Sequence, residues 1–211
     1  MAEMIQGSPA WLDARCGKVT ASRVADVLAL RKDGKPRAER ESYLMELVGE
    51  RVTGLATQHY LTAAMLEGSE REPQACDAYE FLYGVDTVKV GFVDHPTIAL
   101  AGASPDRLVG AVGLVEFKRP TLRTHLETLL SGEIPEDHRP QMRWHMACTG
   151  RAWCDFASWH PSVPPALRLW VKRLHRDDAQ IARDEAAVNA FLDEVEERMT
   201  ALVAIGTAEA A

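Results

Sequence analysis

Three residues in the segment GASPDRLVGAVGLVEFKRP (102–120) have side chains suited to metal or acid–base chemistry: Asp106, Glu116 and Lys118. Residues two apart in a β-strand share a face, so Glu116 and Lys118 project together while Phe117 points the opposite way, into the core. Burying an unpaired carboxylate or ammonium group is costly. The two charged groups therefore either pair on an exposed strand face or line a polar cleft.

Asp106 favours the polar cleft. DRLVG and GLVEFK are typical of two strands joined by a tight glycine-containing turn, and such a hairpin places Asp106 beside Glu116. Adjacent carboxylates repel each other unless a cation lies between them, and hard oxygen ligands favour Mg²⁺ or Mn²⁺. A lysine beside that metal can orient water and neutralise charge on a phosphate. The pattern indicates metal-dependent phosphodiester hydrolysis, although so short a pattern also occurs by chance.

The sequence around this segment contains both strand-like and helix-like patterns. Short β-branched or apolar runs bounded by Gly, Pro or Asp predict strands at 87–94, 98–104, 106–110, 113–119, 152–159 and 167–174. Helical patterns are expected at 18–30, 39–50, 57–82, 122–132, 139–150 and from 177 onward.

Local signals set the limits of several of these helices. Thr20 or Ser22 can cap the first, and Pro73 is expected to kink or break the third. Gly132 and Gly150 are expected to end the next two. The order of elements predicts an α/β fold with a mixed central sheet flanked by helices and a long C-terminal helix, in a single domain, 1–211, with a frayed tail at 206–211.

Composition restricts the class of protein. No apolar run approaches the roughly 20 residues that span a membrane, and the N-terminus lacks the pattern of a signal peptide, so we expect no membrane association and a cytoplasmic location. The net charge of −7 argues against indiscriminate nucleic-acid binding. Bases are nevertheless concentrated in residues 15–40 and acids after residue 177. This asymmetry indicates either a basic cleft on an acidic body or two solvated faces.

Asp106, Glu116 and Lys118 resemble the PD-(D/E)xK signature of restriction-endonuclease-like nucleases. Three further blocks, WLDARCGKVTASRVADVL, LEGSEREPQACDAYEFLYGVDT and RPQMRWHMACTGRAWCDFASW, occur in the order found in the phage lambda exonuclease family, the YqaJ-like alkaline exonucleases. The resemblance extends from about residue 11 to residue 159. It implies the restriction-endonuclease-like core and a bacterial cytoplasmic protein encoded by a phage or prophage.

The resemblance also implies roles for the catalytic residues. Asp106, Glu116 and the Phe117 carbonyl would bind a first Mg²⁺, and Lys118 would position the attacking water. Glu72 would complete the site from a helix, at a second Mg²⁺ or its water shell. Two metal ions per site are expected, and Mn²⁺ is expected to substitute for Mg²⁺.

A 5′-phosphate site is implied at Arg15, Ser22 and Ser104. A guanidinium can grip phosphate bidentately, and a hydroxyl near a helix N-terminus adds a donor where the helix dipole favours an anion. Two plainer interpretations remain open at this stage. Arg15 can instead form a salt bridge with Asp13 or a similar acid, and Ser22 can be an ordinary helix cap.

Further DNA contacts are less defined. Gln141 is expected to contact the end nucleotide or the active site, but Arg143 replaces the second amide that the family often has, so which of the two reaches DNA stays open. Met65 lies where the family places an apolar wedge between the separating strands. Among the histidines, His145, one helical turn beyond Gln141, is the nearest candidate for a role in the site. No role is assigned to Arg119.

The expected function is a Mg²⁺-dependent 5′-to-3′ exonuclease that digests the 5′-phosphorylated strand of double-stranded DNA ends to mononucleotides. The remaining 3′ overhang would serve single-strand annealing recombination. The resemblance implies a ring-shaped homotrimer and a single-strand annealing protein as partner. Two alternatives remain: an endonuclease or single-strand-specific nuclease of the same fold, and a non-catalytic DNA-binding protein.

Overall fold

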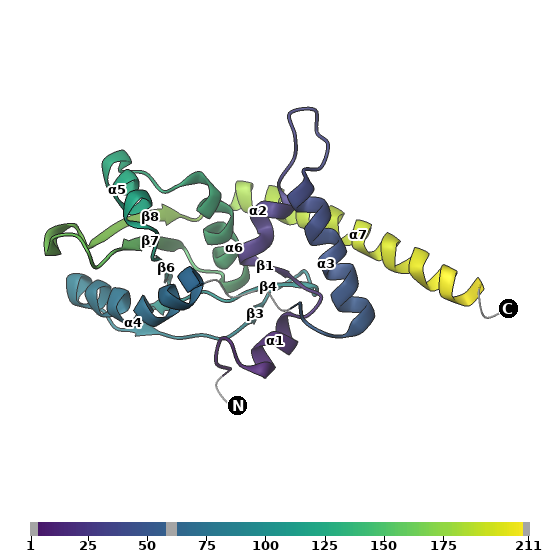
Figure 1. Cartoon of the computed structure of the whole chain (residues 1–211), viewed down its shortest axis with the longest axis horizontal. Coiled ribbons are helices and arrows are strands. Elements are labelled where there is room, and N and C mark those ends of the chain that lie inside the picture. Colours follow the sequence, from purple (N-terminus) through teal and green to yellow (C-terminus); the bar gives the residue numbers. More distant parts are fainter. Residues whose placement is uncertain (1–3, 58–62, 209–211) are drawn as a thin grey trace.

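The computed structural model describes residues 4–57 and 63–208, and for residues 63–71 it describes the backbone alone. The fold is mixed α/β with two sheets and a long C-terminal helix (Figure 1). Among the described helices, none combines the length and the hydropathy that a membrane-spanning helix requires.

The larger sheet has five strands in the order β2-β5-β6-β7-β8. These strands are β2 (Thr87–Val88), β5 (Arg107–Val109), β6 (Gly113–Lys118), β7 (Trp153–Trp159) and β8 (Leu169–His175). The smaller sheet has the order β1-β4-β3 and comprises β1 (Val19–Thr20), β4 (Ala101–Ala103) and β3 (Val93–Asp94). Both sheets are mixed, because β6 pairs parallel to β7 and β1 pairs parallel to β4.

The helices are α1 (Pro9–Arg15), α2 (Val24–Val27), α3 (Ala38–Thr53), α4 (Ala63–Tyr83), α5 (Leu122–Ser131), α6 (Arg139–Thr149) and α7 (Asp178–Ala208). Short 3-10 helices η1 (Ala21–Arg23), η2 (Glu136–His138) and η3 (Pro165–Leu167) connect them. Gly132 and Gly150 end α5 and α6 in the left-handed conformation, as predicted.

The predicted hairpin is confirmed. β5 and β6 are antiparallel with Arg107 opposite Val115, and Gly110 in the turn has a φ of +52°, which glycine adopts without strain. One step further along this register, Asp106 lies opposite Glu116. The turn therefore fixes the two acids on adjacent strands although nine residues separate them in the chain.

β6 is almost entirely buried because helices cover both faces of its sheet. On one face, the Phe117 ring meets Tyr79 of α4 edge-on, with 5.8 Å between centroids. On the other face, Leu114 packs with Met142 and Met146 of α6. Because β6 is sandwiched between α4 and α6, these two helices face opposite sides of the strand that carries Glu116 and Lys118.

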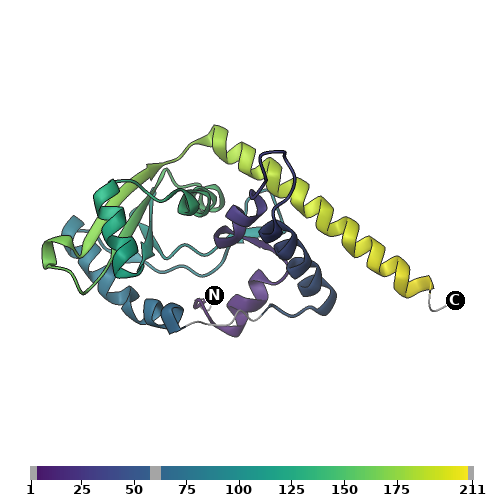
Figure 2. The ribbon, with the colours of Figure 1, turned by 45° about the horizontal axis from the view of Figure 1, so that its top comes forward.

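A second core lies beneath the smaller sheet. Residues of α2, α3 and α7, including Val24, Leu47 and Val195, pack there, and Tyr43 stacks on Phe191. α7 runs along α3 and then extends beyond the body, where Leu202 and Val203 are exposed (Figure 2). Apolar residues of α7 thus pack against the core only as far as about Met199. The helix continues to Ala208, so part of the tail that was expected to be frayed, 206–211, is helical.

Two segments differ from the sequence-based expectation because tertiary pairing overrides local pattern. The predicted helix at 18–30 is instead β1, η1 and α2, because Val19 and Thr20 pair with Ala101 and Gly102. The predicted strand at 87–94 divides into β2 and β3, which belong to different sheets.

Two helices also differ. Of the kink or break predicted at Pro73, the break does not occur: α4 continues through Pro73 as one helix, and Ala75, Cys76 and Tyr79 pack its following turns against the sheet. Helix α1 was not expected, although Ser8 caps it by accepting a hydrogen bond from the Trp11 amide.

Candidate active site

Asp106 and Glu116 are held together by the β5–β6 hairpin. The Phe117 amide donates a hydrogen bond of 2.7 Å to Oδ2 of Asp106, while the Phe117 ring is buried in the core. Glu116 points to the opposite face of β6 from Phe117, and its side chain is 4% exposed. Both carboxylates thus leave the strands at one place, with their orientation set by the backbone.

Glu116 is surrounded by side chains from β6 and α6. Its Oε1 accepts hydrogen bonds from Lys118 Nζ at 2.8 Å and from Gln141 Nε2 at 2.7 Å. Lys118 Nζ also donates to Gln141 Oε1 at 3.0 Å. The other oxygen, Oε2, lies 3.0 Å from His145 Nε2, but the pair does not have hydrogen-bond geometry. Gln141 therefore ties Glu116 and Lys118 together.

The two acids have opposite pKa shifts. Burial and the negative charges of Glu116 and Glu72 raise the pKa of Asp106 to about 8. Burial also disfavours the charged form of Glu116, but Lys118 and His145 outweigh it and hold the pKa of Glu116 below its ordinary value. Burial opposes the charge of Lys118, yet Glu116 raises the Lys118 pKa. The site accordingly has one carboxylate that stays ionised and one whose protonated form is favoured, because Lys118 offsets the effects of burial and of the neighbouring acids on Asp106 only in part.

These residues fit a hard divalent cation. Asp106 and Glu116 supply carboxylate oxygens, and Oε2 of Glu116 is buried without a hydrogen bond. Without a metal the raised pKa of Asp106 favours its protonated form, and a bound cation would favour the carboxylate instead. No group of three or more His, Cys, Asp or Glu side chains in the described residues is arranged to hold a metal. A cation here would complete its shell with backbone carbonyl, such as that of Phe117, and water, as Mg²⁺ commonly does.

Glu72 lies at the edge of this site but is engaged by arginines. Its Oε1 accepts a 2.6 Å hydrogen bond from Arg107, and its Oε2 lies 3.9 Å from Arg119. Glu72 is close enough to raise the pKa of Asp106. The structure therefore places Glu72 next to the carboxylates, as expected, and gives Arg119 a location beside it that the sequence did not suggest.

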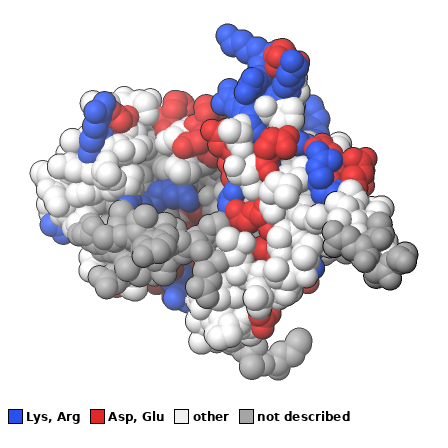
Figure 3. All heavy atoms as spheres, turned by 45° about the vertical axis from the view of Figure 1, so that its right-hand side comes forward, with Lys and Arg blue, Asp and Glu red and all other residues white. Residues whose placement is uncertain are grey.

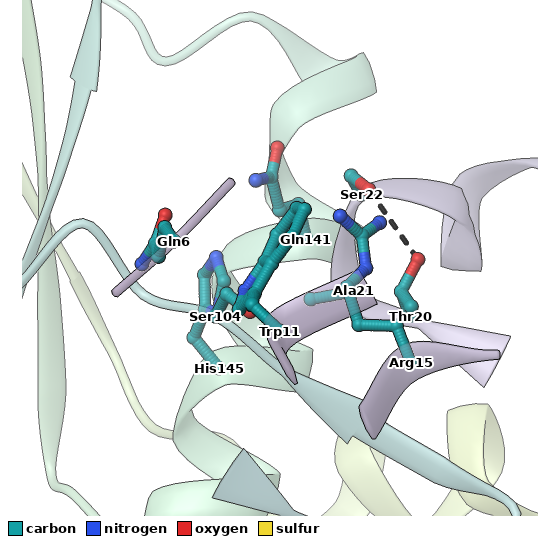
Figure 4. Close-up of a pocket in the computed structure, with 9 residues that line it drawn as sticks. All are labelled: Gln6, Trp11, Arg15, Thr20, Ala21, Ser22, Ser104, Gln141 and His145. Atoms are coloured by element: carbon teal, nitrogen blue, oxygen red, sulfur yellow. Dashed lines mark hydrogen bonds between the residues drawn. The ribbon is translucent and has the colours of Figure 1, made fainter. Parts of the chain in front are cut away.

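A pocket adjoins the carboxylates and gathers the residues predicted to bind phosphate. Its lining includes Arg15, Ser22, Ser104 and Gln141 (Figure 4). His145 also lines it, and Gln141 and His145 both contact Glu116. The N-terminal segment of α1, β1 and η1 thus converges with Ser104, which follows β4, and with α6.

Arg15 has no ion pair with Asp13 or with any other acid among the described residues. Its guanidinium instead stacks over the Trp11 ring, 3.9 Å from the centroid. Burial lowers the pKa of Arg15, although a guanidinium stays charged at neutral pH. Trp11 in turn donates from Nε1 to Ser104 Oγ at 2.8 Å. The stack orients Arg15 and links it to Ser104.

Ser22 does not cap a helix. Neither η1 nor α2 has a side-chain cap, and Ser22 is an exposed residue whose hydroxyl lies 3.4 Å from that of Thr20. Arg143 is absent from the pocket lining and donates to buried Asp184 of α7 at 2.7 Å. Of the two candidates on α6, Gln141 alone is brought to the site. Met65 lies outside the described side chains.

Residues 10–152 match the YqaJ-like viral recombinase domain. The chain belongs to this family. No protein in the curated set that we compared matches the sequence.

Solved structures agree with this membership. An alkaline exonuclease from Laribacter hongkongensis is similar at 44% identity and a TM-score of 0.88, covering 97% of this chain and all of the relative. The same enzyme in complex with dAMP aligns at 45% identity, with the same TM-score and coverage. This YqaJ-like chain is thus a nuclease with the PD-(D/E)xK fold. A phage-related exonuclease from Haemophilus somnus 129PT, at 15% identity and a TM-score of 0.68 over 88% of this chain and 96% of its own, shares the fold.

Three residues of the YqaJ-like site had no assigned role in the sequence. Trp11 orients Arg15, and Gln6 donates from Nε2 to the carbonyls of Val90 and Pro105. Gln6 therefore fixes the residue preceding Asp106, a contact that only the folded chain reveals. His145 touches Glu116, and its position one turn after Gln141 was the only available signal.

Proposed function

We propose that the chain is a Mg²⁺-dependent 5′-to-3′ exonuclease that digests the 5′-phosphorylated strand of double-stranded DNA ends. One observation carries the proposal. The pocket containing Arg15, Ser22 and Ser104 shares Gln141 and His145 with the carboxylate cluster. An anion held in this pocket would therefore lie next to the groups that hydrolyse a phosphodiester.

In this proposal Asp106, Glu116 and the Phe117 carbonyl hold Mg²⁺, which would activate water and neutralise charge on the scissile phosphate. The ammonium of Lys118 has three N–H donors. Two are directed at Glu116 Oε1 and Gln141 Oε1, which leaves the third to orient the attacking water. Gln141 maintains this arrangement because it bonds to both charged groups. Glu72, held by Arg107, would act at a second metal or its water shell.

End recognition would follow from the charge of the pocket. A terminal phosphate carries more negative charge than a phosphodiester, and Arg15 has no carboxylate partner among the described residues to compete with it. Its stacking on Trp11 leaves the edge of the guanidinium available for bidentate contact. The hydroxyls of Ser22 and Ser104 add hydrogen-bond donors. The complex of the Laribacter relative with dAMP supports mononucleotides as the product.

Duplex binding would involve the basic loop between α2 and α3. Its bases Arg31, Lys32, Lys35 and Arg37 are exposed and project from the body. Figure 3 shows Lys and Arg gathered on this projection and again within a hollow of the same face. We propose that these bases track the backbone of the duplex, in a homotrimeric ring whose 3′-ended product passes to a single-strand annealing protein.

Three matched substrates test this function: a linear duplex with 5′-phosphates, the same duplex with 5′-hydroxyls, and a covalently closed circle, each with Mg²⁺ or with chelator. We expect rapid digestion of the first, slow digestion of the second, and none of the circle or with chelator. Cleavage of the circle would favour the endonuclease alternative, and indifference to the end group would contradict a phosphate-reading pocket.

A further inference from the structure

Two residues of helix α6 contact the Glu116 carboxylate. Gln141 and His145 are four residues apart on α6 and therefore share a face. Gln141 donates to Oε1 of Glu116 at 2.7 Å, and His145 Nε2 lies 3.0 Å from Oε2. Each oxygen thus has its own neighbour one helical turn apart.

The environment of His145 points to a role in the site and not in the core. Its side chain is 1% exposed, and neither ring nitrogen has a hydrogen bond in the described structure. A buried imidazole without a hydrogen bond is costly, and because Nε2 already lies 3.0 Å from Glu116 Oε2, a small movement would align the two for one. His95, which stacks on Trp144 of α6, differs from His145 at Nδ1, because its Nδ1 accepts from the amides of Thr97 and Ile98. Its Nε2, 3.2 Å from Glu185, also lacks a hydrogen bond.

We infer that His145 is a positioning residue for the metal site, which orients Glu116 by donating from Nε2 to Oε2. A carboxylate oxygen has two lone pairs, so Oε2 can accept this bond and still face a cation. With Oε1 held by Lys118 and Gln141, the carboxylate then has one orientation. The inference rests on the proposed function, because it presupposes that Glu116 binds the metal.

The test is Mn²⁺ binding to the protein alone, measured by calorimetry without DNA. The amide nitrogen of Gln can replace Nε2 of His, whereas that of Asn reaches only the position of Nδ1. His145→Ala and His145→Asn should weaken Mn²⁺ binding about tenfold or more, as removal of an outer-shell partner does, while His145→Gln should stay within about threefold of wild type. His95→Gln, at another buried histidine that packs against α6, should bind as wild type does.

The possible results distinguish a failure of the positioning role of His145 from a failure of the proposed function. Wild-type affinity in His145→Ala, or equal rescue by Asn and Gln, would overturn the positioning role while leaving the metal site intact, provided Asp106→Asn abolishes Mn²⁺ binding. Failure of wild type to bind Mn²⁺ would overturn the proposed metal site and this inference together. If His145→Ala does not fold, the difference in Mn²⁺ affinity between His145→Gln and His145→Asn still tests the positioning role.

Discussion

The backbone amide of Phe117 donates a 2.7 Å hydrogen bond to Oδ2 of Asp106. This bond joins the residue before β5 to the end of β6 and brings Asp106 beside Glu116, although burial and neighbouring acids disfavour the Asp106 charge. Folding of the hairpin therefore holds the two carboxylates together against their mutual repulsion. A cation bound between them would offset this repulsion.

Asp106→Asn should abolish Mg²⁺-dependent hydrolysis while leaving DNA ends bound. Asn preserves the size of the side chain and can still accept from the Phe117 amide, but it removes the charge that holds the metal. We expect the rate to fall by at least about 100-fold, since loss of outer-shell partners alone costs 10- to 100-fold. Digestion and gel-shift assays of one preparation measure both quantities. Retained activity would refute the ligand role.

The stability of the metal-free protein should decrease as pH rises. Asp106 ionises near its ordinary pKa of 3.8 in the unfolded chain but near 8 in the folded chain, so the folded state binds more protons between these values. Stability is therefore lost across this window, at no more than about 1.4 kcal/mol per pH unit from this residue. Urea unfolding in chelator, from about pH 5 to about pH 9, should show a shallower decline for Asp106→Asn. Parallel declines would exclude Asp106 as the source.

Arg15→Ala should remove the preference for phosphorylated ends. A charge-assisted hydrogen bond contributes about 1.5–3 kcal/mol, so digestion of 5′-phosphorylated ends should slow about 10- to 100-fold, with little change for 5′-hydroxyl ends. Arg143→Ala is the matched control, because Arg143 pairs with Asp184 and does not line the pocket. Its end preference should match wild type. Equal slowing on both ends by Arg15→Ala would make Arg15 structural.

Glu72→Ala should reduce stability as well as activity. Arg107 is 8% exposed and its guanidinium would lose its carboxylate partner. We expect unfolding free energy to fall by about 1–3 kcal/mol, and Glu72→Gln, which keeps an acceptor, to recover part of the loss. If Gln restores stability without restoring Mg²⁺-dependent rate, Glu72 acts at the metal. Restoration of both would limit Glu72 to holding Arg107.

The β5–β6 hairpin could be predicted from the sequence because its signals are local. Alternating strand residues, a glycine turn and adjacent acids all lie within 102–120, and Gly132 and Gly150 end their helices as their residue types predict. Ser104 and Arg15, assigned through the family resemblance, converge in one pocket. Their roles in binding phosphate stay predictions.

The parts that could not be predicted depend on long-range contacts. β1 is only two residues long and exists because Val19 and Thr20 pair with β4, against a local helical pattern. Arg107 pairs with Glu72 from another element, and Gln6 reaches the carbonyl of Pro105. No periodicity in the sequence encodes such pairs, so they follow only once the chain is folded.

The most direct test of the account follows a label placed on the 5′-phosphate of one strand of a blunt duplex. Mg²⁺ is added and the products are resolved by length. We predict that the label appears first and almost entirely as a mononucleotide, while the complementary strand keeps its 3′ end and full length at early times. Release of the label in oligonucleotides, or shortening from the 3′ end with the label retained, would contradict 5′-to-3′ digestion.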